Sequence, residues 1–597
     1  MIRSIRPFPA WSLFLAAAAV QCSLGGCSSA EPGMGSDAAA APLQAVAAHS
    51  DYGMVATGSP EATRAAVEIL ERGGNAVDAA VAAAIMLSVA DTDGSGLGGM
   101  TYLVLHLADG RDLVIDGSPP APVGVVPAEL LALELEGRLF GHKTVAVPTT
   151  PAVLELARSR YGTLPMAELI APAIGVAEQG YLLSPIQITW THRYMEQLLA
   201  STYLRFVAME DGRTVGRPGD RLCRPALAAT LRRLAARGIA DFYRGGVADT
   251  IERDMIAHGG FLRKPDLAAL RVRERPALRT TYRAFDVLSF PPPGGGCRVT
   301  GALNVLEHFP SSLLATDSVE RLNLLVEAFR IANAGDAALS AVLPNGSHAL
   351  DGCIDATEAA ALARLIEIGR VIPPERLESG GDPRCAKFGE STTQISVIDQ
   401  YGNVVSLTQT LGRSYGAAVM APELGFPYND FLETFNFSHP DCPNYLRPRI
   451  VLPTPMAPTI VLRDGILVAA LGSGASNRIP HIITGTISNL VDRGMDLPSA
   501  VAAPRILWGG TVEQEPRVLM EIAGPLSEAD ADALLGLGYP TLDRVRFPAD
   551  ALALARMGSI NAVGSDPVRG GFVGVGDPRR SGVALGPRVI AERHGPQ

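Results

Sequence analysis

Histidine is scarce in this sequence, and the familiar motifs for metal and nucleotide chemistry are missing. Ten of the 597 residues are histidine, scattered along the chain without an HExxH pattern, so we expect no bound metal ion and no other cofactor. The chain also contains no GxxxxGK[ST] phosphate loop. This absence argues against P-loop nucleotide enzymes.

Positive charge is also limited. Lys and Arg number 51 against 61 Asp and Glu, the net charge is −10, and we find no basic stripe along the chain. A nucleic-acid partner is therefore not expected. Hydrophobic residues make up 47% and charged residues 19%, which is typical of a folded globular chain.

Residues 1–26 differ from the rest and predict an export signal. Arg3 and Arg6 precede an apolar stretch over residues 11–20, and small residues follow, which is the order of a secretory signal peptide. The segment ends in Leu-Gly-Gly-Cys27, which resembles a bacterial lipobox and implies acylation of Cys27 after cleavage. The alternative is an ordinary signal peptide with a chance cysteine.

Residues 27–48 are rich in Ser, Gly, Ala and Pro, a composition that suits a flexible tether. No later segment offers 18 uninterrupted apolar residues, so no spanning helix is predicted. We therefore expect an exported bacterial lipoprotein that its N-terminal lipid holds at the periplasmic face of the cell envelope, with the outer membrane as the expected site.

Five cysteines remain after Cys22 and Cys27 are assigned to the signal and the lipid. Export permits disulfides. Cys353 and Cys385 lie in one irregular region, and we choose them as the pair. The others, Cys223, Cys297 and Cys442, we expect to be buried thiols.

Helical patterns come early in the chain, and paired strand patterns come late. Helices are predicted over residues 60–72 and 76–88, and the second is nearly all apolar and should be buried. Hairpins with a glycine in the turn are predicted at residues 102–115, 394–408 and 459–471. Residues 124–380 are expected to be mostly helical. This order predicts an α+β fold in which helices cover antiparallel sheets.

Two adjacent threonines, Thr392 and Thr393, stand directly before a predicted strand. If the chain were cut before Thr392, its hydroxyl would be a nucleophile and its own α-amine, with a pKa of about 7.7–8.0, would be the base. No histidine would be needed. The ordinary explanation of threonines at this position is β-propensity, and the local sequence does not decide between the two.

A short loop of small residues, 472–476 (GSGAS), joins a predicted strand to a helix that begins at about residue 477. Backbone N–H groups and the positive end of the helix dipole converge at such a junction. The loop therefore predicts a site for negative charge.

A series of short motifs resembles the gamma-glutamyltransferase family of N-terminal-nucleophile enzymes over about residues 50–590. In order they are 73–80 (GGNAVDAA), 94–99 (GSGLGG), 145–148 (VAVP), 242–245 (FYRG), 259–260 with 266–267 (GG, DL), 291–296 (PPPGGG), 392–394 (TTQ), 399–410 (DQYGNVVSLTQT), 458–461 (PTIV) and 577–579 (DPR). Any one of them is unspecific, but their order over the whole chain is specific.

The resemblance implies a four-layer αββα sandwich and self-cleavage between Ser391 and Thr392. The products would be a large chain, residues 49–391, and a small chain, residues 392–597, which stay associated. Thr392 would form an acyl-enzyme with a small-molecule or peptide amide, and water or an amine would release the acyl group. Thr410 matches a second family threonine that assists the nucleophile, although it could also be a solvent-exposed strand-end residue.

The family's oxyanion hole falls at Ala475 and Ser476, where paired glycines are usual. Their backbone N–H groups remain available as donors, and each such donor is worth roughly 3–4 kcal/mol in the transition state. The φ angles at both positions must then suit residues other than glycine.

The residues that grip a glutamyl group in the family are replaced here. Ser118 stands near the position of the arginine that binds the α-carboxylate, and a serine cannot make that bidentate contact. Gly412 replaces an asparagine, Phe431 a glutamine, Thr434 the acid that binds the α-amine, and Thr454 begins the former serine pair. We therefore expect ordinary gamma-glutamyl compounds to be poor substrates.

Three functions stay open on these grounds. The first is an amidohydrolase or acyltransferase that acts on a non-glutamyl acyl group. The second is a true gamma-glutamyltransferase or glutathione hydrolase that uses substitute contacts. The third is a degenerate, uncleaved binding protein of the cell envelope. Two chains on a denaturing gel would separate the first two from the third.

Overall fold

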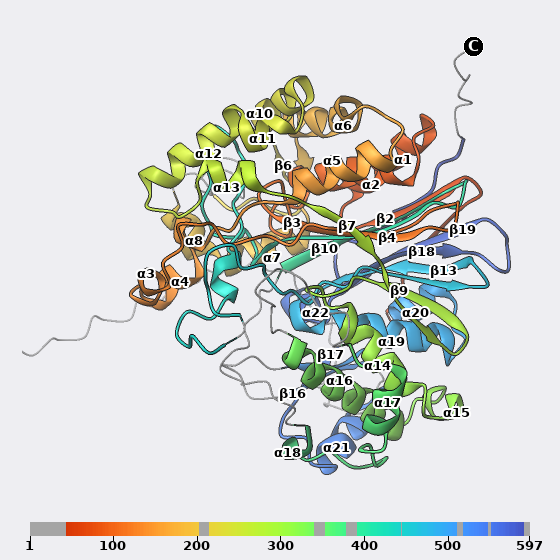
Figure 1. The fold of residues 1–597 in the computed structure, drawn as a ribbon. Helices are drawn as coiled ribbons and strands as arrows, with labels where there is room; N and C mark the ends of the chain where they lie inside the picture. Colours follow the sequence, from red (N-terminus) through yellow and green to blue (C-terminus); the bar gives the residue numbers. More distant parts are fainter. Residues whose placement is uncertain are drawn as a thin grey trace, which may run out of the picture. The chain divides into compact units, whose positions relative to one another are not determined.

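Two stacked antiparallel sheets form the centre of the structure (Figure 1). This computed structural model describes residues 43–201, 214–339, 353–377, 391–442, 444–509, 517–546 and 551–589. The first sheet runs in the order β20 (Val583–Leu585), β2 (Gly53–Thr57), β10 (Ser391–Asp399), β11 (Val404–Gly412), β3 (Met100–His106), β4 (Asp112–Asp116), β7 (Arg273–Pro276). The second runs β1 (Ala47–Ser50), β19 (Phe572–Gly576), β18 (Ser559–Ser565), β13 (Ile466–Leu471), β12 (Thr459–Arg463), β9 (Phe285–Ser289), β8 (Leu278–Tyr282), and β14 (Ser473–Gly474) pairs with β18.

Helices cover the outer face of each sheet. On the first sheet lie α1 (Pro60–Glu71), α2 (Ala76–Ala90) and α5 (Thr150–Tyr161), with α6 (Met166–Gln179) packed on α2 and α10 (Pro225–Arg237) on α6 (Figure 1). On the second lie α14 (Gly296–Leu306), α19 (Ile479–Val491) and α20 (Leu497–Ala502), with α16 (Val319–Leu339) packed on α14. The expected α+β architecture, a four-layer αββα sandwich with antiparallel sheets between helical layers, is confirmed.

Smaller elements surround these layers. They are α3 (Pro127–Leu131), α4 (Leu135–Leu139), η1 (His142–Thr144), β5 (Tyr181–Leu182), α7 (Pro185–Arg193), α8 (Met195–Ala200), β6 (Arg221–Leu222), α11 (Ala240–Arg244), α12 (Gly246–Ala257), α13 (Lys264–Ala269), α15 (Ser311–Leu314), α17 (Ala356–Ala363), α18 (Pro374–Leu377), η4 (Phe431–Thr434), η5 (Ser476–Arg478), β15 (Ile506–Gly509), β16 (Arg517–Ile522), α21 (Glu528–Gly536), β17 (Leu542–Arg546) and α22 (Ala551–Arg556).

Local sequence accounts for the first helices and the hairpins. The Asn75 side chain accepts the backbone N–H groups of Val77 and Asp78 and so caps α2, whose 15 residues are all buried. The three predicted hairpins are present as β3–β4, β10–β11 and β12–β13. Because α2 is apolar on nearly every side, it packs against the first sheet on one side and against other helices on the other.

Residues 124–380 are less uniformly helical than expected. They contain β7, β8 and β9, and these three strands extend both central sheets. Strand β8 has an alternating pattern with two of its five residues exposed, so its pairing with β9 rather than its own hydrophobicity keeps it extended. The prediction failed here because strands this short, two of them at sheet edges, carry little local signal.

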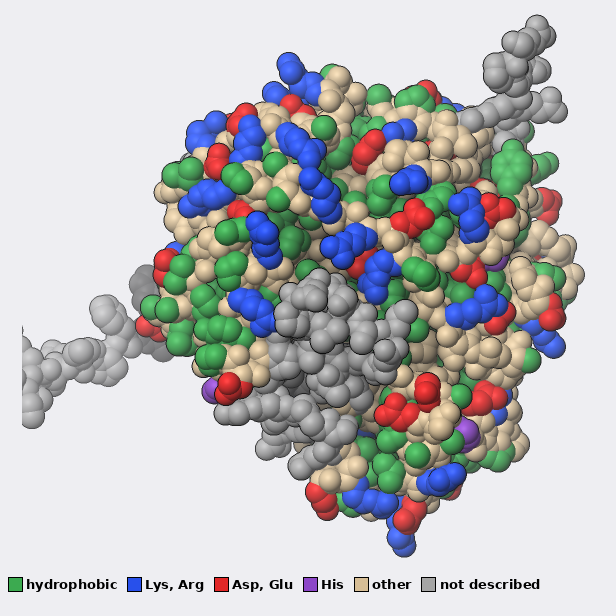
Figure 2. All heavy atoms as spheres, viewed as in Figure 1, with side chains coloured by type: hydrophobic (Ala, Val, Ile, Leu, Met, Phe, Trp, Pro, Cys, Tyr) green, Lys and Arg blue, Asp and Glu red, His purple; other side chains and the backbone are tan. Residues whose placement is uncertain are grey.

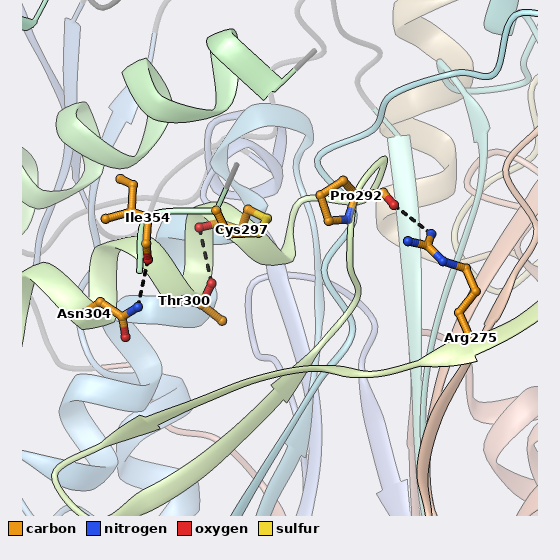
Figure 3. Close-up of a disulfide and its surroundings, with 7 residues drawn as sticks. Arg275, Pro292, Cys297, Thr300, Asn304 and Ile354 are labelled. Atoms are coloured by element: carbon orange, nitrogen blue, oxygen red, sulfur yellow. Dashed lines mark hydrogen bonds between the residues drawn. A yellow bond between two sulfur atoms is a disulfide. The ribbon is translucent and has the colours of Figure 1, made fainter. Parts of the chain in front are cut away.

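The cysteine pairing also differs from the prediction. Cys353 is bonded to Cys297 at the start of α14, with 5.0 Å between their Cα atoms, and not to Cys385, which lies outside the described residues (Figure 3). Asn304 on the same helix donates to the carbonyl of Ile354 at 2.9 Å, which holds the partner segment in place. Cys223 is exposed rather than buried, and Cys442 is disulfide-bonded rather than a free thiol.

The predicted export signal, the acylation site Cys27 and most of the tether lie outside the described residues, and all three stay predictions. Within the described part of the chain, no helix is long and apolar enough to cross a membrane. Figure 2 shows acidic side chains interspersed among the Lys and Arg on the face in view.

Candidate active site

The predicted nucleophile lies at the start of a central strand. Thr392 is the second residue of β10 and is buried. The pairing of β10 with β11 shifts register between Ser391 and Thr393, so Thr392 lies opposite both Thr410 and Leu411. Such a two-against-one bulge re-aims a side chain and is common beside active sites. The bulge thus brings the two predicted catalytic threonines together.

The backbone of Thr392 is held from two directions. Arg580 Nη1 donates to the Thr392 carbonyl oxygen at 3.3 Å. Gly474 in β14 approaches the same oxygen so closely that a Cβ at this position would collide with it. Glycine at 474 therefore permits the second sheet to pack against the nucleophile.

A cavity with about 380 Å³ of space opens beside Thr392. Its lining combines the predicted residues with apolar ones from the 452–456 loop: Met100, Thr392, Thr410, Gly412, Phe431, Thr434, Leu452, Pro453, Thr454, Pro455, Met456 and Ser476. Most predicted site residues therefore share one cavity. Met100, Leu452 and Met456 were not predicted from the sequence, since apolar residues give no chemical signal.

Ser118 is a site residue that the structure does not bring into this lining. Its hydroxyl lies 2.5 Å from Asp116 and 2.6 Å from the hydroxyl of Tyr102. Asp116 in turn pairs with Arg275 at 2.8 Å. Ser118 is thus a member of a structural network beside the cavity.

Gly412 leaves no empty space where the family has an asparagine. It has φ +104°, and the carboxyl of Asp430 occupies the place of a Cβ. Asp430 accepts the backbone N–H of Arg413 at 3.1 Å, and Arg413 Nε lies 3.4 Å from Glu433. Burial, reinforced by Glu433, raises the pKa of Asp430 well above its usual range. This acidic pair is engaged with Arg413 and with backbone.

The predicted oxyanion loop has an unusual backbone. Ala475 and Ser476 have φ of +116° and +56°, a left-handed region that glycine tolerates and other residues rarely adopt. Ser476 lines the cavity, and Ala475 lies beneath it, buried. Non-glycine residues held in this conformation at a catalytic loop indicate backbone strain that the surrounding fold maintains.

Relief of this strain gives a testable prediction. Ala475→Gly is expected to raise the free energy of unfolding by about 1 kcal/mol, because a left-handed residue other than glycine costs roughly 1–2 kcal/mol. Urea unfolding measures the change. The matched control is Ala470→Gly in the extended strand β13, which should lower stability by about 1 kcal/mol. A destabilised Ala475→Gly variant would contradict the strained geometry.

A second cavity reaches Thr392 from the other side, and the sequence did not predict its polar residues. Asp91, Asp93, Asn561 and Arg580 line it. Burial, together with the charge of Asp93, raises the pKa of Asp91 well above its usual range. The signal was present in the sequence, since both acids directly precede the glycine-rich 94–99 loop, but their partner Arg580 lies nearly 500 residues away.

The fold and the site together define a class. A threonine at the start of a central strand, in a two-sheet core covered by helices on both faces, is the arrangement of an N-terminal-nucleophile hydrolase. Comparison with known proteins gives the family: the sequence profile of gamma-glutamyltranspeptidase matches residues 62–586, and the chain belongs to this family. It is an enzyme of the gamma-glutamyltransferase-like amidohydrolase and acyltransferase group.

The relatives of this chain include proteins named acylase and proteins named glutathione hydrolase. The chain is 34% identical over 534 residues to "Acylase ACY 1 proenzyme" of Pseudomonas sp. (strain SE83), covering 87% of this chain and 91% of the relative. It is 32% identical over 558 residues to "Glutathione hydrolase proenzyme" of Pseudomonas sp. (strain A14), covering 90% and 94%. Among solved structures, cephalosporin acylase from Bacillus halodurans superposes with a TM-score of 0.78 at 25% identity, covering 94% of this chain and 99% of that one.

Proposed function

We propose that this enzyme cleaves itself between Ser391 and Thr392 and then uses Thr392 to hydrolyse or transfer an acyl group that is apolar rather than glutamyl. The observation that carries the proposal is the lining of the main cavity, where two threonines of the acylation machinery face Phe431, Leu452 and Pro455. The word proenzyme in the names of both Pseudomonas relatives supports self-processing.

The chemistry follows from one residue. The Thr392 hydroxyl gives its proton to the newly formed α-amine of the same residue, and its oxygen attacks the carbonyl carbon of the substrate. The oxyanion that forms is stabilised by the backbone N–H groups of Ala475 and Ser476. The C–N bond breaks as the leaving amine takes the proton. Water, or an amine, then attacks the ester in the same way and restores the hydroxyl.

Thr410 has a supporting role in this scheme. Its hydroxyl accepts the backbone N–H of Gly412 at 3.0 Å, which orients it at the end of β11. It lines the same cavity as Thr392 across the bulge. Thr410 is therefore a positioning residue for the nucleophile.

The pocket is poorly equipped for a glutamyl group. A zwitterion would need an acid for its ammonium and an arginine for its carboxylate. The position of the acid holds Thr434, whose hydroxyl is bonded to the Phe431 carbonyl at 2.7 Å, and Ser118 lies outside the lining. Leaving both charges without buried partners would cost several kcal/mol. The acylase names among the relatives agree with an altered acyl specificity.

The glutathione hydrolase names among the relatives keep a glutamyl substrate as the second candidate. The acids Asp430 and Glu433 adjoin the lining residues Phe431 and Thr434, and one of them would have to face the ammonium. Their engagement with Arg413 argues against it.

A substrate panel tests this specificity. Against p-nitroanilides of acetyl, hexanoyl, phenylacetyl and L-gamma-glutamyl groups, we expect kcat/KM for the best apolar acyl group to exceed that for gamma-glutamyl at least tenfold, which corresponds to about 1.4 kcal/mol. Phe431→Gln should lower the ratio of apolar to gamma-glutamyl kcat/KM by about tenfold, because the apolar acyl group loses its contact with the phenyl ring. The control Phe431→Leu should leave it nearly unchanged. Preference of the unmodified enzyme for gamma-glutamyl would refute the apolar pocket and favour the second candidate.

A further inference from the structure

Three residues far apart in the sequence meet at the surface on the side of the helical layer that covers the first sheet. Asp254 lies in the last turn of α12, His258 ends that helix, and His142 begins η1. The ligand-bearing atoms of the three all lie within 4.8 Å of one another. We refer to them as the His–Asp–His cluster.

The carboxylate of Asp254 stands between the two imidazoles. Its Oδ2 lies 3.2 Å from His142 Nε2, and its Oδ1 lies 3.2 Å from His258 Nδ1. The imidazole rings are nearly parallel, with centroids 4.4 Å apart. Two nitrogen atoms and one carboxylate group thus converge on one small volume.

The surrounding fold holds this arrangement in place. Asp254 and His258 are four residues apart at the end of one helix, and such residues share a helix face. A Cβ at Gly260 would lie 2.8 Å from the His142 carbonyl oxygen, so this glycine allows the chain after α12 to pack against His142. On the other side, Gly141 donates to the Ala417 carbonyl at 2.7 Å.

Two of the three side chains are nearly buried, and the third is open to solvent. The side chains of His142 and Asp254 are 12% and 9% exposed, whereas that of His258 is 48% exposed. The hydroxyl of Tyr428, itself buried, interacts with Asp254 from beneath. A ligand that binds the cluster would therefore keep an open side toward solvent while its inner side is fixed.

We propose that the His–Asp–His cluster binds one divalent transition-metal ion of the zinc type. Imidazole and carboxylate ligands suit Zn²⁺, and three protein ligands with water in the fourth position are a common zinc arrangement. Two atoms bound to one tetrahedral zinc at about 2.0–2.1 Å stand roughly 3.3 Å apart. Each imidazole nitrogen lies 3.2 Å from a different oxygen of Asp254, and one ligand atom from each residue fits within 4.8 Å. Ca²⁺ and Mg²⁺ prefer sites made of oxygen atoms and do not fit.

Binding requires the exposed His258 ring to rotate, because two stacked imidazoles cannot both point an in-plane lone pair at one ion. It also requires His258 Nδ1 to leave the Asp254 carbonyl oxygen, 2.9 Å away, and a tautomer change in the rings. In the metal-free chain each imidazole can place its proton toward the Asp254 carboxylate. When the metal takes His142 Nε2 and His258 Nδ1, each ring carries its proton on the other nitrogen and remains neutral. No redox step and no covalent rearrangement of the protein is involved.

The position of the ion gives it a structural role. It would join the end of α12 to η1, and Ala146, two residues after η1, is bonded to the segment that leads into the cavity wall. Asn429 accepts from Ala146 at 2.9 Å and donates to its carbonyl at 3.1 Å. Phe431 follows two residues later. The ion would thus stabilise the wall of the acyl pocket without touching the substrate.

Isothermal titration of the tag-free full-length enzyme with Zn²⁺ tests the proposal. We expect about one high-affinity ion per chain, with Mg²⁺ in excess failing to compete. His258→Ala, at the most exposed ligand and therefore safest for folding, should weaken binding at least tenfold. The matched control His192→Ala removes an exposed histidine elsewhere and should leave binding unchanged.

A second readout reports the coordination itself. Co²⁺ bound in place of Zn²⁺ should give visible absorption bands of a tetrahedral nitrogen and oxygen site, and these bands should be absent in His258→Ala and in Asp254→Asn. Zinc binding that is equal in the unmodified enzyme and in His258→Ala would overturn the proposal, as would the absence of any binding. The cluster would then be a carboxylate capped by two histidines.

Discussion

Replacing Thr392 by alanine is expected to abolish both turnover and self-cleavage. The variant should run as one chain, whereas the active enzyme should give two, the smaller about 22 kDa in proportion to its share of the 62.6 kDa total. Amidase activity should fall by roughly 10⁴-fold or more, because removal of a covalent nucleophile leaves only binding and oxyanion stabilisation. Denaturing gels and a chromogenic amide assay measure the two effects.

Two neighbouring changes serve as controls. Thr392→Ser keeps a hydroxyl on the same backbone and should still be cleaved, more slowly. Thr393→Ala removes the adjacent hydroxyl, which lies near Asp91, and should preserve the nucleophile. Normal processing of Thr392→Ala, or loss of processing only in Thr393→Ala, would assign the chemistry to a different residue.

Replacing Asp577 by alanine is expected to destabilise the fold by about 3–5 kcal/mol, the usual effect of removing one partner from a buried ion cluster. Asp577 is fully buried and accepts from Arg505 at 2.5 Å and from the backbone of Ile560 at 2.7 Å. Arg579 pairs with both Asp577 and Glu521. Without Asp577, Arg505 loses its buried carboxylate partner. Urea unfolding measures the change.

The Asp577 carboxylate also makes the free energy of unfolding depend on pH. Although burial opposes it, the charges of Arg505 and Arg579 lower the pKa of Asp577 below its usual range. The stability that Asp577 contributes is therefore present above the unfolded pKa of about 3.9 and is lost as the pH falls through the lower folded value. The control Glu367→Ala removes an exposed pair with Arg370 and should change stability by no more than about 0.5 kcal/mol. Equal effects of the two substitutions would contradict the role of the buried cluster.

The sequence was most informative where the signal is local or where many motifs occur in order. A nearly all-apolar run after Asn75 predicts helix α2. A glycine turn between two strand patterns predicts the β10–β11 hairpin. Thr392 was ambiguous by itself and became a strong candidate only through the ordered motifs around it. The structure then supplied a physical reason, the bulge that sets it opposite Thr410.

Features that depend on distant segments were missed or misassigned. Cys297 pairs with Cys353 because the fold brings α14 beside the 353–354 segment, which cysteine spacing does not reveal. Ser118 aligns with a substrate-binding position but is held by Tyr102 and Asp116. The His–Asp–His cluster was not predicted from the sequence, since 116 residues separate its two histidines.

The central claim is that Thr392 becomes the first residue of a separate chain. Intact-mass analysis of the purified enzyme under denaturing, non-reducing and then reducing conditions, followed by N-terminal sequencing, tests it most directly. The account predicts a small chain that begins Thr-Thr-Gln-Ile and a larger partner that co-purifies with it. A single chain that spans residue 392, or a new terminus at any other residue, would contradict it.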